Sequence, residues 1–171
     1  RQDLIHSEDP SRITAGAILS TTLYYDLLNK MAVFAKICGK EEDIQGYKEL
    51  AAKMKDAYNA KYFNKEKAQY DNNTVTANLL SLRLGLVPEG YEAKVFENIV
   101  KKTNEDFNGH VSTGVLGIQH LMRGLTEYGR LDMAYKLLTN EDYPSWGYTI
   151  KQGATTIWEL WNGDTADPAM N

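Results

Sequence analysis

Cysteine and histidine are scarce in this sequence. Cys38 is the only cysteine, so an internal disulfide is excluded, and the cysteine content does not indicate whether the compartment is reducing or oxidising. The three histidines, His6, His110 and His120, lie far apart and form no ligand pair at the short spacing typical of metal sites. A glycine-rich phosphate loop and a nucleophile elbow are also missing from the sequence. The sequence therefore predicts no metal site.

Long apolar runs and an excess of basic residues are absent as well. No apolar run approaches the roughly 20 residues needed to span a bilayer, and the start, "RQDLIHSEDP", has neither an initiator methionine nor an apolar signal core. The net charge of -4 offers no basic surface to a phosphate backbone. We therefore expect neither a membrane nor a nucleic acid as a partner. The compartment, cytoplasmic or exported, stays open.

The remaining composition is that of an ordinary globular protein. Of the 171 residues, 43% are hydrophobic and 25% are charged. Such a length favours a single domain, here residues 1–171. The first ten residues look like those of an excised or processed piece of a longer chain.

Apolar residues recur at helical spacing through most of the chain. In the first periodic segment Ile13, Ala17, Leu28, Met31 and Ala35 predict one buried stripe, and Cys38, at its end, is expected to be a buried thiol. The second segment places Ile44, Tyr47, Leu50, Met54 and Ala57 on one face. The predicted helices cover residues 11–38, 41–63, 74–85, 89–106, 115–129 and 130–142.

These helices pair into three hairpins that open near residues 12, 74 and 114. The uneven spacing argues against a regular repeat array. A solenoid, a helical bundle and part of an α/α toroid all remain compatible with this pattern. The sequence thus predicts an all-α fold.

The stretch "YPSWGYTIKQGATTIWELWNG", residues 143–163, lacks the helical apolar spacing of the preceding segments and holds all three tryptophans. Its β-branched and aromatic residues predict an extended segment or strand around "ATTIWELW". Alternation in such a segment places Glu159 on the same side as Ile157 and Trp161, with Trp158 and Leu160 opposite.

An acid between tryptophans suits sugar chemistry. Aromatic faces pack on the apolar face of a pyranose, and a carboxylate can act as a general base or nucleophile. On spacing alone, however, Glu159 is more often a helix cap, an ion-pair partner or a surface acid. The loop "FNGHVSTG" offers His110, Ser112 and Thr113, which could bind ligand hydroxyls or cap the next helix.

The same segments resemble a known family. "STGVLGIQHLMRGLTEYGRLDMAYKLL" followed by "YPSWGYTIKQGATTIWELWNG" closely resembles the late catalytic domain of bacterial α-L-rhamnosidases, glycoside hydrolase family 78. The upstream stretches "MAVFAKICGKEEDIQGYKELAAKMKDAYNAKYF" and "LRLGLVPEGYEAKV" are similar to the hairpins that precede it. The resemblance covers nearly the whole chain.

This resemblance implies about half of an (α/α)6 barrel, the six-hairpin glycosidase type, that removes terminal α-L-rhamnosyl residues with inversion. The family's "GATTIWE" glutamate, its general base, falls on Glu159. Trp146, Trp158 and Trp161 become sugar contacts or pocket walls, and His110 becomes a ligand for a sugar hydroxyl. The implied partners are rhamnosides of plant or microbial glycans, and the implied hydrolysis needs no cofactor.

Two departures from the family pattern qualify these expectations. The family commonly has arginine where this chain has Leu160, and its acidic motif of the kind "RDERxGWxGD" occurs nowhere between Arg1 and Asn171. We therefore expect the general acid to lie outside this chain, which would be inactive without the remainder of the parent enzyme. Another toroidal glycosidase, a polysaccharide lyase, or a non-catalytic module that binds carbohydrate or protein remain alternatives.

Overall fold

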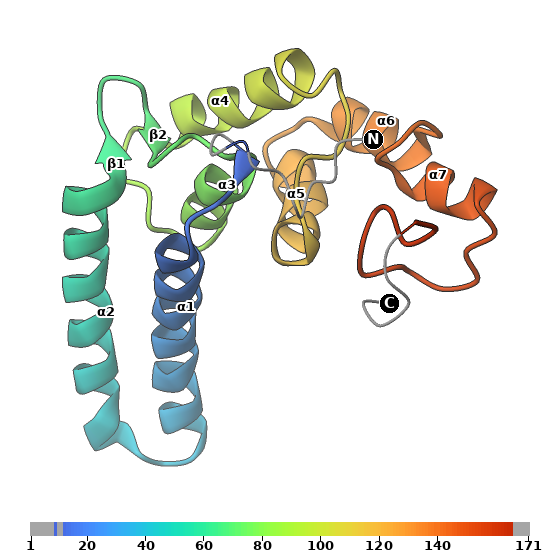
Figure 1. Ribbon diagram of the computed structural model, residues 1–171. Coiled ribbons are helices and arrows are strands. Elements are labelled where there is room, and N and C mark those ends of the chain that lie inside the picture. The colour runs from blue at the N-terminus through green and yellow to red at the C-terminus, as the bar shows by residue number, and fades with distance from the viewer. Residues whose placement is uncertain (1–8, 10–11, 166–171) are drawn as a thin grey trace.

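The computed structural model describes residue 9 and residues 12–165, and the outermost parts of the predicted domain lie outside this range. Within the described residues the chain forms seven helices and one short β-hairpin (Figure 1). None of the described helices is long and apolar enough to cross a membrane. The elements are α1 (Gly16–Ile37), α2 (Glu41–Tyr62), β1 (Phe63–Asn64), β2 (Gln69–Tyr70), α3 (Val75–Arg83), α4 (Glu92–Glu105), α5 (Val115–Glu127), α6 (Leu131–Thr139) and α7 (Trp146–Lys151).

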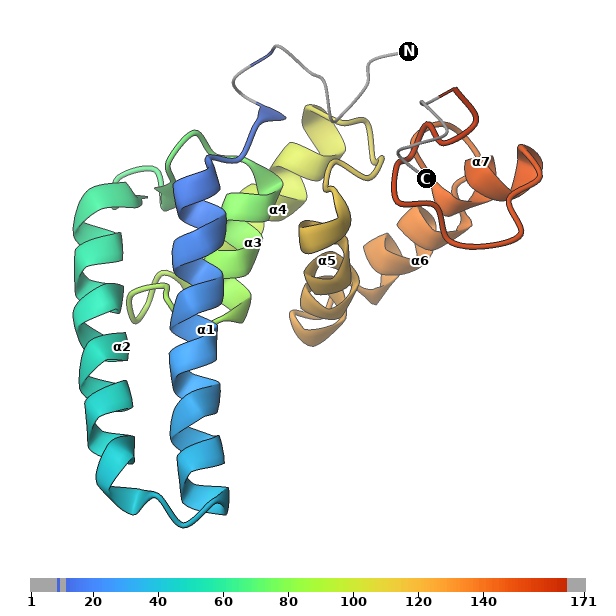
Figure 2. The ribbon, with the colours of Figure 1, turned by 60° about the horizontal axis from the view of Figure 1, so that its bottom comes forward.

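Consecutive helices pack in pairs, α1 with α2, α3 with α4, and α5 with α6. Helix α3 contacts both α1 and α5, so it lies between the first helices of the other two pairs (Figure 2). Helix α6 also packs against α7. The predicted all-α fold of helical hairpins is confirmed.

Helix α3 lies at the centre of the core. Every residue from Val75 to Leu82 is buried, which is expected for a helix with neighbours on several sides. The Thr74 hydroxyl caps its start by accepting a hydrogen bond from the backbone N–H of Ala77 at 3.2 Å. The hydroxyls of Tyr58 and Ser81, 2.8 Å apart, connect α2 to α3 inside the core.

The predicted burial of Cys38 is wrong. Helix α1 ends one residue earlier, and Cys38 lies in the exposed turn before α2. Gly39, with a φ of 68°, adopts the left-handed conformation that ends the helix. The hairpin tip projects away from the other pairs (Figure 1), which leaves Cys38 exposed.

The buried faces of the first two helices also differ from the predicted stripes. Leu28 and Ala35 are buried as expected, whereas Ile13 and Leu50 are exposed. Ile13 lies in the loop before α1 and not on the helix. Leu50 is exposed because α1 and α2 pack on one another along their length but meet α3 only near one end. Helix α1 buries Ile18, Thr22, Leu28, Ala32 and Ala35, and α2 buries Ala51 and Tyr58.

The sequence did not predict helix α7 or the hairpin of β1 and β2. In the hairpin, Phe63 pairs with Tyr70 and Asn64 with Gln69. Helix α7 begins after Ser145, whose hydroxyl accepts a hydrogen bond from the backbone N–H of Tyr148 at 3.0 Å. After α7 the segment up to residue 165 is non-helical, but it consists of bends and turns and forms no strand.

The loops that precede α1, α3 and α5 meet at one end of the helical pairs. The Thr14 and Thr74 hydroxyls are 2.7 Å apart, and the Asn72 side-chain amide donates to the Ile13 carbonyl at 2.7 Å. The Trp161 indole N–H donates to the Thr113 carbonyl at 3.0 Å, which attaches the tryptophan segment to the same end. The candidate site lies at this junction.

Candidate active site

Glu159 lines a hollow at the junction of these loops. This hollow, which we call the glutamate hollow, has a volume of about 370 Å³. Leu160 and Trp161 share its wall with Glu159, while Thr14 and Ser112 contribute hydroxyl-bearing side chains from other loops. Segments from both ends of the described chain therefore build one site.

The carboxylate of Glu159 is exposed, and among the described residues it forms no hydrogen bond or ion pair. Its neighbours hold it in place. Leu160 is buried, and Trp161 is hydrogen-bonded to the loop before α5. The Tyr148 hydroxyl donates to the Asp164 carboxylate at 2.8 Å and joins the following turn to α7. A solvated carboxylate on a fixed segment is suited to accepting a proton from water.

The three tryptophans gather with Glu159 around a smaller hollow of about 60 Å³. The rings of Trp146 and Trp161 pack edge to face, with centroids 5.3 Å apart, and both pack against the hydrophobic core. Trp158 is half-buried in the wall of the same hollow. Two of the predicted sugar contacts thus also serve to attach the segment to the core.

The segment does not show the alternation of two faces that was predicted for a strand. Ile157 is 85% exposed and Leu160 is only 5% exposed. Glu159 nevertheless shares a hollow wall with Trp161, its predicted neighbour, and it also lines the smaller hollow together with Trp158. The turn that begins at Leu160 places both indoles in the same hollow wall as Glu159.

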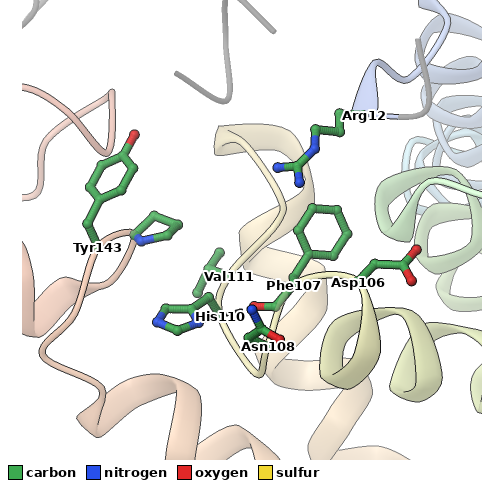
Figure 3. A pocket seen from close by; sticks show the side chains of 8 residues that line it. Arg12, Asp106, Phe107, Asn108, His110, Val111 and Tyr143 are labelled. Atoms are coloured by element: carbon green, nitrogen blue, oxygen red, sulfur yellow. Dashed lines mark hydrogen bonds between the residues drawn. The ribbon is translucent and has the colours of Figure 1, made fainter. Parts of the chain in front are cut away.

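His110 does not line the glutamate hollow. It lines a neighbouring hollow of about 320 Å³, which we call the histidine hollow (Figure 3). Its Nδ1 lies 3.1 Å from the carbonyl oxygen of Phe107, and since a carbonyl only accepts, Nδ1 is the donor. The structure therefore separates His110 from Glu159, although both face the same end of the molecule.

Arg12 and Phe107 lie where the two hollows meet, because both residues line both of them. The Arg12 guanidinium lies over the Phe107 ring, 5.0 Å from its centroid. Sequence reasoning missed these two residues. Arg12 belongs to no motif, Phe107 opens the loop "FNGHVSTG" without being singled out in it, and only the fold brings the two together.

Two hydroxyls near the glutamate hollow are buried without a hydrogen-bond partner among the described residues. They belong to Ser112 and Thr113, which the sequence had marked as possible hydroxyl ligands or helix caps. Helix α5 begins at Val115 without a side-chain cap, so capping is not their role. Within the described residues no cluster of His, Cys, Asp and Glu side chains could hold a metal ion.

Comparison with known proteins places this geometry in a family. The model of the bacterial α-L-rhamnosidase six-hairpin glycosidase domain matches residues 2–171. A curated α-L-rhamnosidase of Formosa agariphila is 36% identical over 158 residues, which cover 92% of this chain and 17% of that protein.

Two solved structures are similar in fold and sequence. The α-L-rhamnosidase of Streptomyces avermitilis, solved in complex with L-rhamnose, aligns with a TM-score of 0.82 and 30% identity over 94% of this chain and 15% of its own. The α-L-rhamnosidase of Dictyoglumus thermophilum aligns with a TM-score of 0.77 and 35% identity over 82% of this chain and 16% of its own. The chain thus spans about a sixth of the length of these relatives. It belongs to the bacterial α-L-rhamnosidase six-hairpin glycosidase family.

Proposed function

We propose that this chain forms part of the catalytic (α/α)6 barrel of an α-L-rhamnosidase, and that Glu159 is its general base. The observation that carries the proposal is the exposed carboxylate of Glu159 on the wall of a hollow of about 370 Å³, beside Trp161. The similar Streptomyces avermitilis enzyme was solved with L-rhamnose, which supports a rhamnosyl group as the ligand of this hollow.

In the proposed reaction, Glu159 takes a proton from a water molecule, and the water oxygen attacks the anomeric carbon. A general acid on the opposite face of the sugar protonates the leaving oxygen, and the configuration at the anomeric carbon inverts. The two carboxyl groups of such a pair lie roughly 6.5 to 9.5 Å apart, which leaves room for the water. We assign the acid to a residue outside these 171.

The tryptophans and neighbouring hydroxyls have a supporting role in this proposal. Trp158 and Trp161 form an apolar wall beside Glu159, against which the apolar face of the sugar can pack. The buried Ser112 hydroxyl, which has no hydrogen-bond partner among the described residues, is a candidate in the glutamate hollow for a group that orients a sugar hydroxyl. His110 faces the neighbouring hollow and would contact a different part of the substrate.

The competing functions leave different products. A polysaccharide lyase releases an unsaturated sugar, another toroidal glycosidase prefers a different glycoside, and a binding module releases nothing. Proton NMR of the complete enzyme acting on an aryl α-L-rhamnoside separates them. We expect β-L-rhamnose as the first anomer formed. An α-anomer as first product, or no hydrolysis of the rhamnoside, contradicts the proposal.

A further inference from the structure

The histidine hollow lies at the described loop end and takes no part in the proposed chemical step. Its volume of about 320 Å³ falls near the lower end of the range for small-ligand sites, about 300 to 1,000 Å³. Figure 3 shows Arg12 and Tyr143 on opposite sides of the hollow, with His110 and Asn108 between them. The walls come from three segments that lie far apart in the sequence.

The lining groups match a neutral, hydroxyl-rich ligand. Arg12 and Asp106 carry opposite charges, so the hollow has no net preference for an anion or a cation. Each charge already has a partner. The Arg12 Nε lies 3.6 Å from the Asp9 Oδ2, and the Asp106 Oδ2 lies 3.1 Å from the Lys102 Nζ. Asn108 adds an amide that can both donate and accept, as a sugar hydroxyl does.

His110 is oriented toward such a role by its backbone partner. Because Nδ1 donates to the Phe107 carbonyl at 3.1 Å, the neutral ring keeps a lone pair on Nε2 and can accept from a hydroxyl. Tyr143 supplies an aromatic face, and its ring is held by an edge-to-face contact with Tyr148 at 5.2 Å between centroids.

The turn that carries Asn108 and His110 is fixed in shape. Asn108 and Gly109 have positive φ values of 50° and 71°, and the N–H of Gly109 donates to the Thr103 carbonyl at 2.9 Å. Gly109 is buried beneath Lys136, whose Nζ would lie 2.9 Å from any added Cβ. The two polar side chains are therefore presented by a pre-organised turn.

The histidine hollow adjoins the glutamate hollow, because Arg12 and Phe107 line both. A ligand that extends from a sugar bound near Glu159 past these two side chains would reach it. We infer that the histidine hollow binds the sugar to which the rhamnosyl group is attached, with His110, Asn108 and Tyr143 as its specificity-determining contacts. This inference rests on the proposed function, because it assigns the leaving-group side of the same substrate.

The test compares two kinds of substrate on the complete enzyme. One is an aryl α-L-rhamnoside, whose leaving group has no sugar hydroxyls, and the other is the best cleaved member of a panel of rhamnosyl-glucose disaccharides of differing linkage. The variants are His110→Ala, the milder His110→Gln, and Asn108→Gly, since glycine keeps the left-handed backbone at that position. Asn104→Ala, an exposed amide on α4 outside both hollows, is the matched control.

We expect the ratio of kcat/KM for the disaccharide to kcat/KM for the aryl rhamnoside to fall about tenfold in each hollow variant, since each loses a hydrogen bond to a sugar hydroxyl. The control should keep the wild-type ratio. A ratio unchanged in all three variants overturns the inference, as does a wild-type enzyme that cleaves the aryl rhamnoside but no disaccharide. An enzyme that cleaves neither substrate refutes the proposed function, and the inference with it.

Discussion

At the scale of single residues, Trp161 has two roles that can be separated. Its ring lines the hollows beside Glu159, and its indole N–H donates to the carbonyl of Thr113, a residue that is only 1% exposed. The second role is structural, because an unpaired buried carbonyl is costly. Loss of activity in a Trp161 variant therefore has to be read together with loss of stability.

Trp161→Phe keeps an aromatic ring but removes the hydrogen bond. We expect the free energy of unfolding to fall by about 1–3 kcal/mol, measured by urea denaturation. Trp158→Phe is the matched control, since no hydrogen bond of the Trp158 indole is found within the described residues. An equal loss in both variants would contradict the anchoring role.

His120 on α5 gives a pH-dependent prediction. Burial, followed by the nearby charge of Arg83, lowers the pKa of His120, and its Nδ1 is buried without a hydrogen-bond partner in the described part of the chain. Between pH 7 and about 5.5 the unfolded state, with a histidine pKa near 6.5, takes up a proton before the folded state does. The free energy of unfolding should therefore fall as the pH falls through this window.

In His120→Gln this contribution is absent. Urea denaturation at pH 7 and pH 5.5 should show a smaller drop in unfolding free energy for the variant than for the wild type. The same drop in both proteins would show that His120 titrates alike in the folded and unfolded states.

At the scale of secondary-structure elements, the close packing of α7 depends on Gly147. A Cβ at this position would collide with the backbone carbonyl of Asn140 and lie 2.9 Å from Cα of Glu141. Since both neighbours belong to the backbone, neither can move without displacing α7. Displacement of α7 would in turn move Trp146 and the segment that carries Glu159.

Gly147→Ala should therefore lower the free energy of unfolding by about 1–3 kcal/mol, through overpacking. Gly46→Ala, in α2, is the control with the opposite sign. Nothing lies within 4 Å of its added Cβ, so the better helix propensity of alanine should stabilise the protein by about 0.5–1 kcal/mol. Thermal unfolding monitored by circular dichroism measures both effects, and a stabilised Gly147→Ala would refute the close contact.

The sequence predicted the long elements well and the short ones poorly. Helices α1 to α6 carry enough turns for apolar spacing to be visible, whereas α7 has only six residues and each strand of the hairpin has two. The Pro144-Ser145 pair before Trp146 was the available signal for α7, because serine is a common helix cap.

The candidate site was predictable where its residues are neighbours in the sequence. Glu159 and the tryptophans lie in one short stretch, so the sequence alone predicted that they lie close together. Arg12 and Phe107 meet only because the loops before α1 and α5 converge. The separation of His110 from Glu159 is likewise a property of the fold, since the sequence does not show that their two loops line different hollows.

At the scale of the whole molecule, α1 and α6 each expose several large apolar side chains. On α1 these include Leu27, Phe34 and Ile37, which are 48%, 53% and 75% exposed. On α6, Leu131, Tyr135 and Leu138 follow at helical spacing. Large exposed apolar patches usually mark an interaction surface. The chain covers about a sixth of its relatives' length, and we propose that the remainder of the barrel covers these faces.

We expect the 171-residue chain on its own to self-associate through the α1 face. The double variant Leu27→Lys with Phe34→Lys should reduce the associated fraction in analytical ultracentrifugation. Ala52→Lys with Ala57→Lys adds the same charge to exposed positions on α2 and serves as the control. Equal reduction by both pairs would mean that net charge, and not the α1 face, governs association.

The central claim is that the Glu159 carboxylate activates water, and one substitution in the complete enzyme tests it most directly. Glu159→Gln keeps the size of the side chain and removes its basicity. We predict that kcat on an aryl α-L-rhamnoside falls by about 10²–10⁴-fold while KM stays within a few fold of the wild-type value. Glu141→Gln, an exposed acid paired with Lys151 and outside the hollows, should leave both constants unchanged. A Glu159→Gln enzyme with near-normal kcat would contradict the account.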